Sequence, residues 1–317
     1  MNEITIRCGV TEQGEVPLAY EDWGDETHPP LLLIMGIGAQ LLLWPDDFSR
    51  ALVSMGFRVI RYDNRDVGLS GKTQAQRSQP LWLLMLRAQL GWQTPVPYTL
   101  ADMATDAAHL LDHLRIPQAH VLGASMGGMI AQVLAAEYPQ RVASLCILFS
   151  STNQPLLPPP APSLLWLLVR RPAADMTLQQ RQEGMKAFLR ALGTATYPPE
   201  EAELDALVTR LLKRGVDPAG MQRQLSALLG SGDLRRYSRR IAAPTLVIHG
   251  DRDRLVRKAG GVAIARAVAN ARLQIMPGMG HDLPAALRPQ LAAMIARHAL
   301  GLEAGWFGIF AFLVTTY

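Results

Sequence analysis

Short runs of apolar residues alternate along the chain with longer segments whose apolar positions recur at helical spacing. The runs are typical of strands that are buried on both faces of a sheet. We expect strands at residues 31–35, 58–62, 120–122, 142–149, 245–248 and 273–276. Helical periodicity and capping residues predict helices from Asp46 or Asp47 to about 56, and at residues 100–114, 129–137, 261–268 and 287–299.

The order of these elements indicates the fold class. Strands that alternate with helices are typical of an α/β fold, in which right-handed crossovers join the strands of a mostly parallel central sheet flanked by helices. Residues 1–150 and 241–300 supply this predicted core. The sequence shows no internal repeat that would indicate a solenoid.

Two stretches interrupt the alternation of strands and helices, and a third stretch follows the last predicted helix. Residues 151–240 lack a strand pattern and carry leucine-rich helical segments, so we expect a helical cap inserted before the last two strands. Residues 71–97 have an apolar centre at 81–86, which either lines a pocket or contacts a membrane surface. The apolar, nearly uncharged tail 301–317 has no predicted role.

Composition narrows the class of protein. Apolar residues make up 49% of the 317 residues and charged residues 18%, which excludes a disordered or fibrous chain. The net charge of +4 comes from interspersed charges, so we expect no nucleic-acid partner. No segment resembles a signal peptide or offers the roughly 20 apolar residues of a membrane span, and we therefore expect a cytoplasmic protein. Cys8 and Cys146 are too few for a disulfide framework.

The sharpest local motif is Gly-Ala-Ser-Met-Gly-Gly at residues 123–128. It lies between a predicted strand and a predicted helix, the context in which a Gly-x-Ser-x-Gly sequence forms a nucleophile elbow. Glycines are needed two residues before and two residues after the serine, because the turn is too tight for side chains at those positions. Ser125 would then emerge at the carboxyl end of the sheet, where the helix N-terminus favours an oxyanion. The alternative is a plain glycine-rich turn with a capping serine.

A serine nucleophile needs a base near neutral pH. His281 is the strongest candidate, since it lies in a glycine-rich loop directly after the last predicted strand and therefore at the same sheet edge as Ser125. His109 and His113 are four residues apart on a helix, a spacing that suits a metal, but a surface position is the simpler interpretation. His249 ends a strand, and we expect it to be structural.

The base in turn needs a carboxylate, and the oxyanion needs backbone donors. Asp251 and Asp253 both follow the strand at 245–248, so either could reach the histidine. For the oxyanion we expect the N–H of Met126, which follows the candidate nucleophile, and the N–H of Ile37, in the small-residue turn after the first parallel strand. The glycines of that turn fail the spacing of a dinucleotide-binding loop.

Five motifs in order resemble the α/β-hydrolase superfamily over residues 4–300, and within it the chain is similar to the aclacinomycin-methylesterase-like group. They are Ile-Met-Gly-Ile-Gly at 34–38, Arg-Tyr-Asp-Asn-Arg-Asp-Val-Gly-Leu-Ser at 61–70, the serine motif, His-Gly-Asp-Arg-Asp at 249–253 and Gly-Met-Gly-His-Asp at 278–282.

The resemblance assigns roles to particular residues. It places the catalytic acid on Asp253 and the oxyanion donors on Ile37 and Met126. It also implies that Asp63 and Arg65 form an internal polar pair. Asp66 replaces the glycine of many broader relatives, although the methylesterase-like group resembles this chain there.

These observations predict a serine hydrolase of carboxylic esters that uses Ser125, His281 and Asp253, with no metal or organic cofactor. The expected partner is a small-molecule ester, and the expected assembly is a monomer or homodimer. Apolar residues in the predicted cap favour small to medium apolar esters; they are Trp166, Leu167, Phe188 and Tyr197.

The same residues are compatible with two other groups of functions. The same triad serves cofactor-free haloperoxidases or perhydrolases, lactonases and carbon–carbon bond hydrolases. A non-catalytic binding protein on this fold is the second alternative, because function resides in the site and not in the fold.

Overall fold

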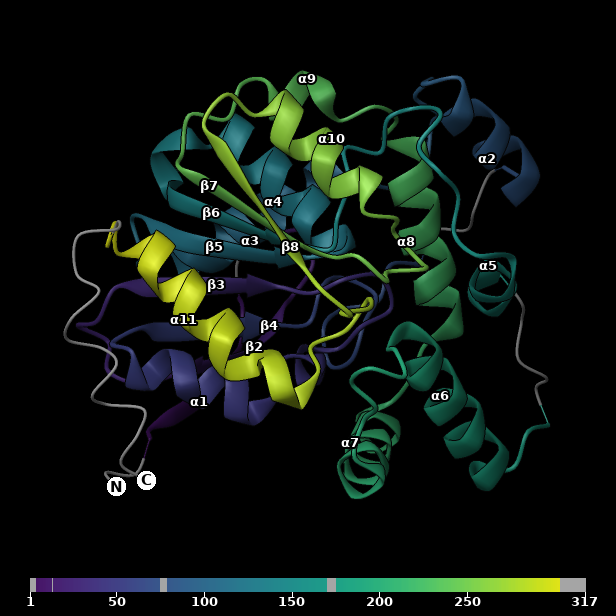
Figure 1. The fold of residues 1–317 in the computed structure, drawn as a ribbon, viewed down its shortest axis with the longest axis horizontal. Coiled ribbons are helices and arrows are strands. Elements are labelled where there is room, and N and C mark those ends of the chain that lie inside the picture. The colour runs from purple at the N-terminus through teal and green to yellow at the C-terminus, as the bar shows by residue number, and fades with distance from the viewer. Residues whose placement is uncertain (1–3, 13, 75–78, 170–174, 303–317) are drawn as a thin grey trace.

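The computed structural model describes residues 4–12, 14–74, 79–169 and 175–302. The tail predicted at 301–317 lies outside this part from residue 303 onward. Within the described residues, the strands form one eight-stranded sheet with the order β1-β2-β4-β3-β5-β6-β7-β8 (Figure 1). The strands are β1 (Ile6–Val10), β2 (Ala19–Trp23), β3 (Pro30–Ile34), β4 (Arg58–Tyr62), β5 (Ala119–Ala124), β6 (Val142–Leu148), β7 (Thr245–Gly250) and β8 (Ala271–Met276).

The sheet is parallel except at one edge. β1 pairs antiparallel with β2, and β2 antiparallel with β4, whereas all other neighbouring strands are parallel. This arrangement confirms the predicted α/β fold with a mostly parallel sheet. Because the carboxyl ends of the parallel strands meet at one edge, the loops after β3, β5, β7 and β8 are brought together there.

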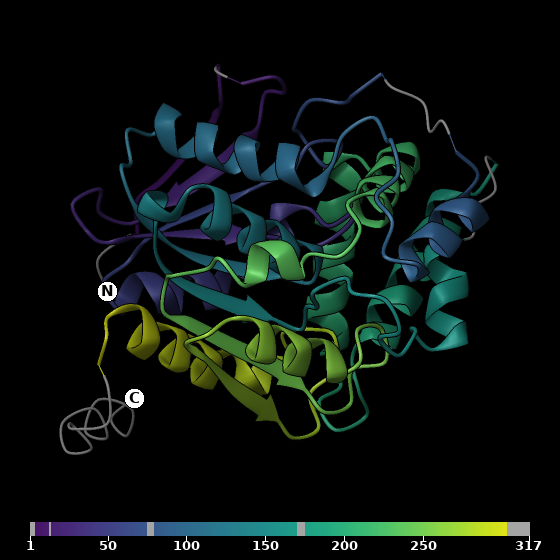
Figure 2. The ribbon, with the colours of Figure 1, turned by 90° about the horizontal axis from the view of Figure 1, so that it is seen from above.

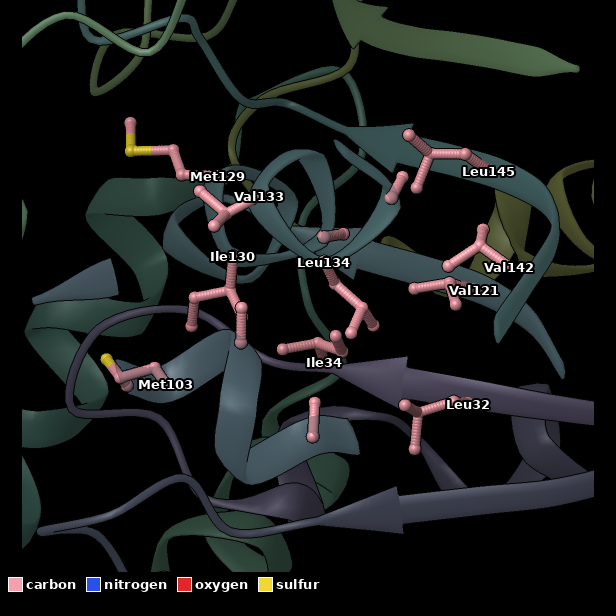
Figure 3. Close-up of a cluster of buried hydrophobic side chains, with 14 of the residues drawn as sticks. Leu32, Ile34, Met103, Val121, Met129, Ile130, Val133, Leu134, Val142 and Leu145 are labelled. Atoms are coloured by element: carbon pink, nitrogen blue, oxygen red, sulfur yellow. The ribbon is translucent and has the colours of Figure 1, made fainter. Parts of the chain in front are cut away.

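Helices cover both faces of the sheet (Figure 2). On one face, α1 (Asp46–Ser54) and α11 (Arg288–Ala299) bury Phe48, Leu52 and Ile295 against the strands. On the other face lie α3 (Leu100–His113), α4 (Met126–Glu137) and α10 (Ala259–Ala267). Figure 3 shows how Ile130 and Leu134 of α4 meet Ile34 in the centre of this second core. Burial on both faces explains why the central strands are continuous apolar runs.

Further helices lie beyond the carboxyl edge of the sheet (Figure 1). They are α2 (Leu81–Gln89), α5 (Pro162–Val169), α6 (Leu178–Leu192), α7 (Glu201–Arg214) and α8 (Pro218–Gly230), and the short α9 (Arg235–Ser238) leads back to β7. Short 3-10 turns occur at Leu41–Leu43, Pro139–Arg141 and Ala285–Leu287.

Helices α7 and α8 are tied to the loop after β4. Arg214 at the end of α7 pairs with Asp63, and Arg223 of α8 donates two hydrogen bonds to Asp66 at 2.9 and 3.0 Å. Both aspartates are fully buried, so these pairs hold the two helices against the edge of the sheet.

One polar pairing suggested by the resemblance is wrong. Asp63 and Arg65 do not pair with each other, because each has a different partner. Arg65 donates to both oxygens of Asp106 on α3, at 2.6 and 2.8 Å, while Asp63 binds Arg214. Asp63 also accepts the backbone N–H of Leu41 at 2.7 Å, so it links the loop after β4 to the loop after β3.

Candidate active site

Ser125 occupies a sharp turn between β5 and α4. Its backbone angles are φ 55° and ψ −121°, a combination that a side-chain-bearing residue adopts only under constraint from its surroundings. The flanking glycines make the turn sterically feasible, since a Cβ at Gly123 would overlap the carbonyl of Gly127, and one at Gly127 would overlap that of Ile34. The serine side chain is half-buried at the carboxyl edge of the sheet.

His281 and Asp253 are joined by a hydrogen bond. His281 Nδ1 lies 2.7 Å from Asp253 Oδ2, and both side chains are buried. The other carboxylate oxygen, Oδ1, accepts the backbone N–H groups of Leu255 and Val256 at 2.8 and 2.9 Å, which fixes the carboxylate plane. A histidine held in this way has its Nε2 free for proton transfer.

The electrostatics keep Asp253 ionised. Burial acts to raise the pKa of this carboxyl, but the charge and hydrogen bond of His281 and the hydrogen bond of His249 outweigh burial and hold the pKa below its usual range. A carboxylate that stays ionised beside an imidazole stabilises the imidazolium that forms when the histidine accepts a proton.

The two neighbouring residues in this motif contact other partners. Asp251 accepts the N–H of Gly278 at 2.7 Å and so braces the loop that carries His281, without touching the histidine. His249 is fully buried, and its Nε2 lies 2.7 Å from the carbonyl oxygen of Val256. The same nitrogen lies 3.4 Å from Asp253 Oδ2, which places His249 behind the acid as part of its support.

Phe149 and its neighbour Leu148, at the end of β6, contact the histidine and the serine, respectively. Phe149 follows β6, and its ring centroid lies 4.7 Å from that of His281. The preceding residue, Leu148, accepts the backbone N–H of Ser125 at 3.0 Å. No hydrogen bond joins Ser125 to His281, both of which are described residues, and catalytic hydrogen bonds are often long before substrate binds.

Ile37 lies in the turn after β3 that passes over the serine. A Cβ at Gly36 would lie 3.0 Å from Ser125 Cβ, which shows how closely the two loops approach. Met126 is the first residue of α4, where helical N–H groups have no intrahelical acceptor. Within the described part of the chain, neither the Ile37 nor the Met126 amide donates a hydrogen bond.

A second carboxyl group lies next to the histidine. Burial raises the pKa of Asp282 to about 6, and the negative charge of Asp253 adds to the shift, while His281 and Arg288 oppose it. The Oδ1 atom of Asp282 is buried and has no hydrogen-bond partner among the described residues. Asp282 is the last residue of the motif at 278–282, but the motif gives no indication that its carboxyl group is buried.

The remaining candidate residues have other contacts in the structure. His113 contacts the Tyr20 hydroxyl at 3.3 Å, and no group of three or more potential metal ligands occurs in the described ranges. Trp166 has 58% of its surface exposed, so it is not a buried pocket residue, whereas Tyr197 donates from its hydroxyl to the carbonyl of Pro277.

In the part of the chain that the structure describes, no helix is long and apolar enough to cross a membrane.

Comparison with known proteins establishes the family. The chain belongs to the alpha/beta hydrolase fold family, whose sequence model matches residues 29–196. This result confirms the membership expected from the motifs.

The proteins that this chain resembles include a methylesterase and an enol-lactonase. Rhodomycin D methylesterase DauP of Streptomyces sp. (strain C5) is 28% identical, over 90% of this chain and 95% of its own length. The 3-oxoadipate enol-lactonase 2 of Acinetobacter baylyi is 26% identical, over 83% of this chain and 85% of its own length. The crystal structure of a hydrolase from Pseudomonas aeruginosa PA01 superposes with a TM-score of 0.68 at 27% identity, covering 93% of this chain and 98% of that one. The chain is accordingly a hydrolase of this superfamily.

Proposed function

We propose that the chain is a serine hydrolase that cleaves carboxylic esters through an acyl-enzyme on Ser125. The observation that carries the proposal is the 2.7 Å hydrogen bond between His281 and Asp253, at the sheet edge where the strained Ser125 turn emerges. The similarity to a methylesterase over 90% of the chain supports an ester as substrate.

The reaction follows from these groups. Ser125 Oγ attacks the ester carbonyl carbon while its proton passes to His281 Nε2. Asp253 holds the histidine tautomer and stabilises the resulting imidazolium. The N–H groups of Ile37 and Met126 donate to the oxyanion of the tetrahedral intermediate.

Collapse of the intermediate breaks the carbon–oxygen bond of the ester, and the alcohol leaves with the proton from His281. Water then attacks the acyl-enzyme, giving its proton to His281. The carboxylic acid is released as Ser125 recovers that proton. Each step uses one base and one pair of oxyanion donors, so the same residues serve both halves of the reaction.

We also propose that residues 151–240 form a cap over this site and that the pocket beneath it selects small to medium apolar acyl or alcohol groups. The contacts of Arg214 and Arg223 with the core loops support a cap that is anchored beside the site. On this basis kcat/KM should rise along a series of p-nitrophenyl esters from acetate to medium-length acyl chains and be lowest for a monoester of a dicarboxylic acid.

A second candidate reaction is lactone opening, favoured by the similarity to an enol-lactonase. The same triad supports it, because a lactone is an internal ester. A panel of p-nitrophenyl esters, methyl esters, enol-lactones and hydrogen peroxide with acetate separates these activities. We expect the highest kcat/KM on an ester. Faster turnover of every enol-lactone than of any ester would favour the second candidate reaction instead.

A further inference from the structure

The side chain of Gln224, on α8, links the two loops that follow β3 and β4. Its Oε1 atom accepts the N–H of Gly38 at 2.7 Å, and its Nε2 atom donates to the carbonyl of Arg65 at 2.7 Å. Gln224 is fully buried, although it lies 186 residues from Gly38 in the sequence. A buried amide that satisfies two loops at once restrains both of them.

The loop after β3 is a tight turn from Gly36 to Ala39. Ala39 N–H donates to the Gly36 carbonyl at 3.3 Å, and Gly38, the third residue of the turn, has φ 63°. A turn in which only the third residue has a positive φ is a type II turn. Types I and II differ in the orientation of the central peptide, here the one between Ile37 and Gly38. Because Gln224 accepts the N–H of that peptide, it selects one of the two orientations.

The same contacts leave one amide of the turn available. The Ile37 N–H belongs to the same planar trans peptide as the Gly36 carbonyl, so it points away from Ala39. The Gly38 N–H is already bound to Gln224. Of these two amides, only that of Ile37 remains to serve a bound substrate.

We infer that Gln224 is a positioning residue that holds the oxyanion donor Ile37 in place from outside the core, through Gly38. The inference rests on the proposed function, in which Ile37 donates to the oxyanion. It makes α8 part of the catalytic framework, because the turn that carries the donor is held at its central peptide by a side chain of α8. Met221 supports the same contact one turn earlier on the helix, since its Cγ lies 3.1 Å from where a Cβ of Gly38 would be.

A positioning role predicts a specific kinetic pattern. Removing one oxyanion donor outright lowers kcat by about 10²–10³. A donor that is only displaced keeps part of its effect, so Gln224→Met should lower kcat by roughly 10- to 100-fold. KM should stay within about twofold, since the oxyanion forms after substrate binds.

The test uses the full-length enzyme with Gln224→Met, Gln224→Asn and the control Ser226→Ala. The shorter Gln224→Asn withdraws the amide from both loops and serves if the Met variant does not fold. Ser226 is a buried residue of the same helix whose hydroxyl donates within the helix to Gln222, so its loss should leave kcat unchanged. Each variant is assayed for kcat, KM and inhibition by two ketones of equal chain length.

The two ketones separate positioning from general damage. A trifluoromethyl ketone forms a tetrahedral oxyanion adduct with the serine, whereas the plain methyl ketone binds without one. We expect the Gln224 variants to lose affinity for the trifluoromethyl ketone in proportion to kcat/KM and to keep their affinity for the methyl ketone. An unchanged kcat, or an equal loss of affinity for both ketones, would overturn the inference.

A further variant in the same experiment tests the proposed function separately from the role of Gln224. Ser125→Ala measured in parallel should be inactive. Retained hydrolysis by Ser125→Ala would reject the proposed function, whereas an inactive Ser125→Ala beside an unaffected Gln224→Met would reject only the positioning role.

Discussion

Asp282 should make the stability of the protein depend on pH in a direction opposite to that of most carboxylates. Its pKa of about 6 lies above the ordinary aspartate value of 3.8 because the group is buried. The folded state therefore binds this proton more tightly than the unfolded chain does. The stabilisation is fully present below the unfolded pKa near 4 and is lost as pH rises through about 6.

The size of this effect follows from the shift. Two pKa units correspond to about 3 kcal/mol, and because part of the Asp282 side chain reaches solvent we expect about half of that, roughly 1.5 kcal/mol. Asp282→Asn, which cannot ionise, should be more stable than the parent protein by this amount at pH 8, and the difference should shrink as the pH falls towards the unfolded pKa near 4.

Urea denaturation followed by tryptophan fluorescence between pH 4.5 and 8 measures the difference directly. Asp175→Asn, the same substitution at an exposed position, provides the matched control. A stability difference between Asp282→Asn and the parent that does not change with pH would refute the electrostatic reasoning. A variant less stable at pH 8 would refute it more strongly, since Asp282 would then be favourable as a carboxylate.

Two further substitutions test the site and the turn. Asp253→Asn should fold normally but lower kcat by up to roughly 10⁴, because His281 would be held in the wrong tautomer. Asp251→Asn should lower thermal stability more than kcat. If Asp251→Asn lowered kcat more than Asp253→Asn while both proteins kept a normal melting temperature, the two roles would have to be exchanged. Gly127→Ala should prevent folding, because its Cβ would overlap the carbonyl oxygen of Ile34, and recovery of this variant as a stable, active protein would show that the turn is looser than described.

Apolar periodicity predicted the central sheet well, because its strands are covered by helices on both faces. The strand Arg58–Tyr62 was predicted with its observed bounds, and α3 begins at residue 100 as predicted, where Thr99 and Asp102 form a capping box. The second strand of the sheet shows where the pattern fails. β2 carries Glu21 and Asp22, whose charges are paired with arginines of β4, so its sequence lacks a strand-like alternation.

The same limit applies to the candidate site. Local motifs pointed to Ser125 and His281, because the elbow and the loop after the last strand have recognisable sequences. The spacing alone left Asp251 and Asp253 open, since both leave the same strand. Gln224 gave no signal at all, because its role depends on loops that reach α8 only in the folded chain.

Labelling with a fluorophosphonate tests directly whether Ser125 is the catalytic nucleophile. A fluorophosphonate reacts with a serine only when that serine is activated by a neighbouring base. We expect one equivalent of label on Ser125, found by mass spectrometry of the digested protein. We also expect labelling to be lost in Ser125→Ala, together with a fall in kcat of about 10⁶. Label on another residue, or a Ser125→Ala variant that retains most of its esterase activity, would show that Ser125 is not the nucleophile.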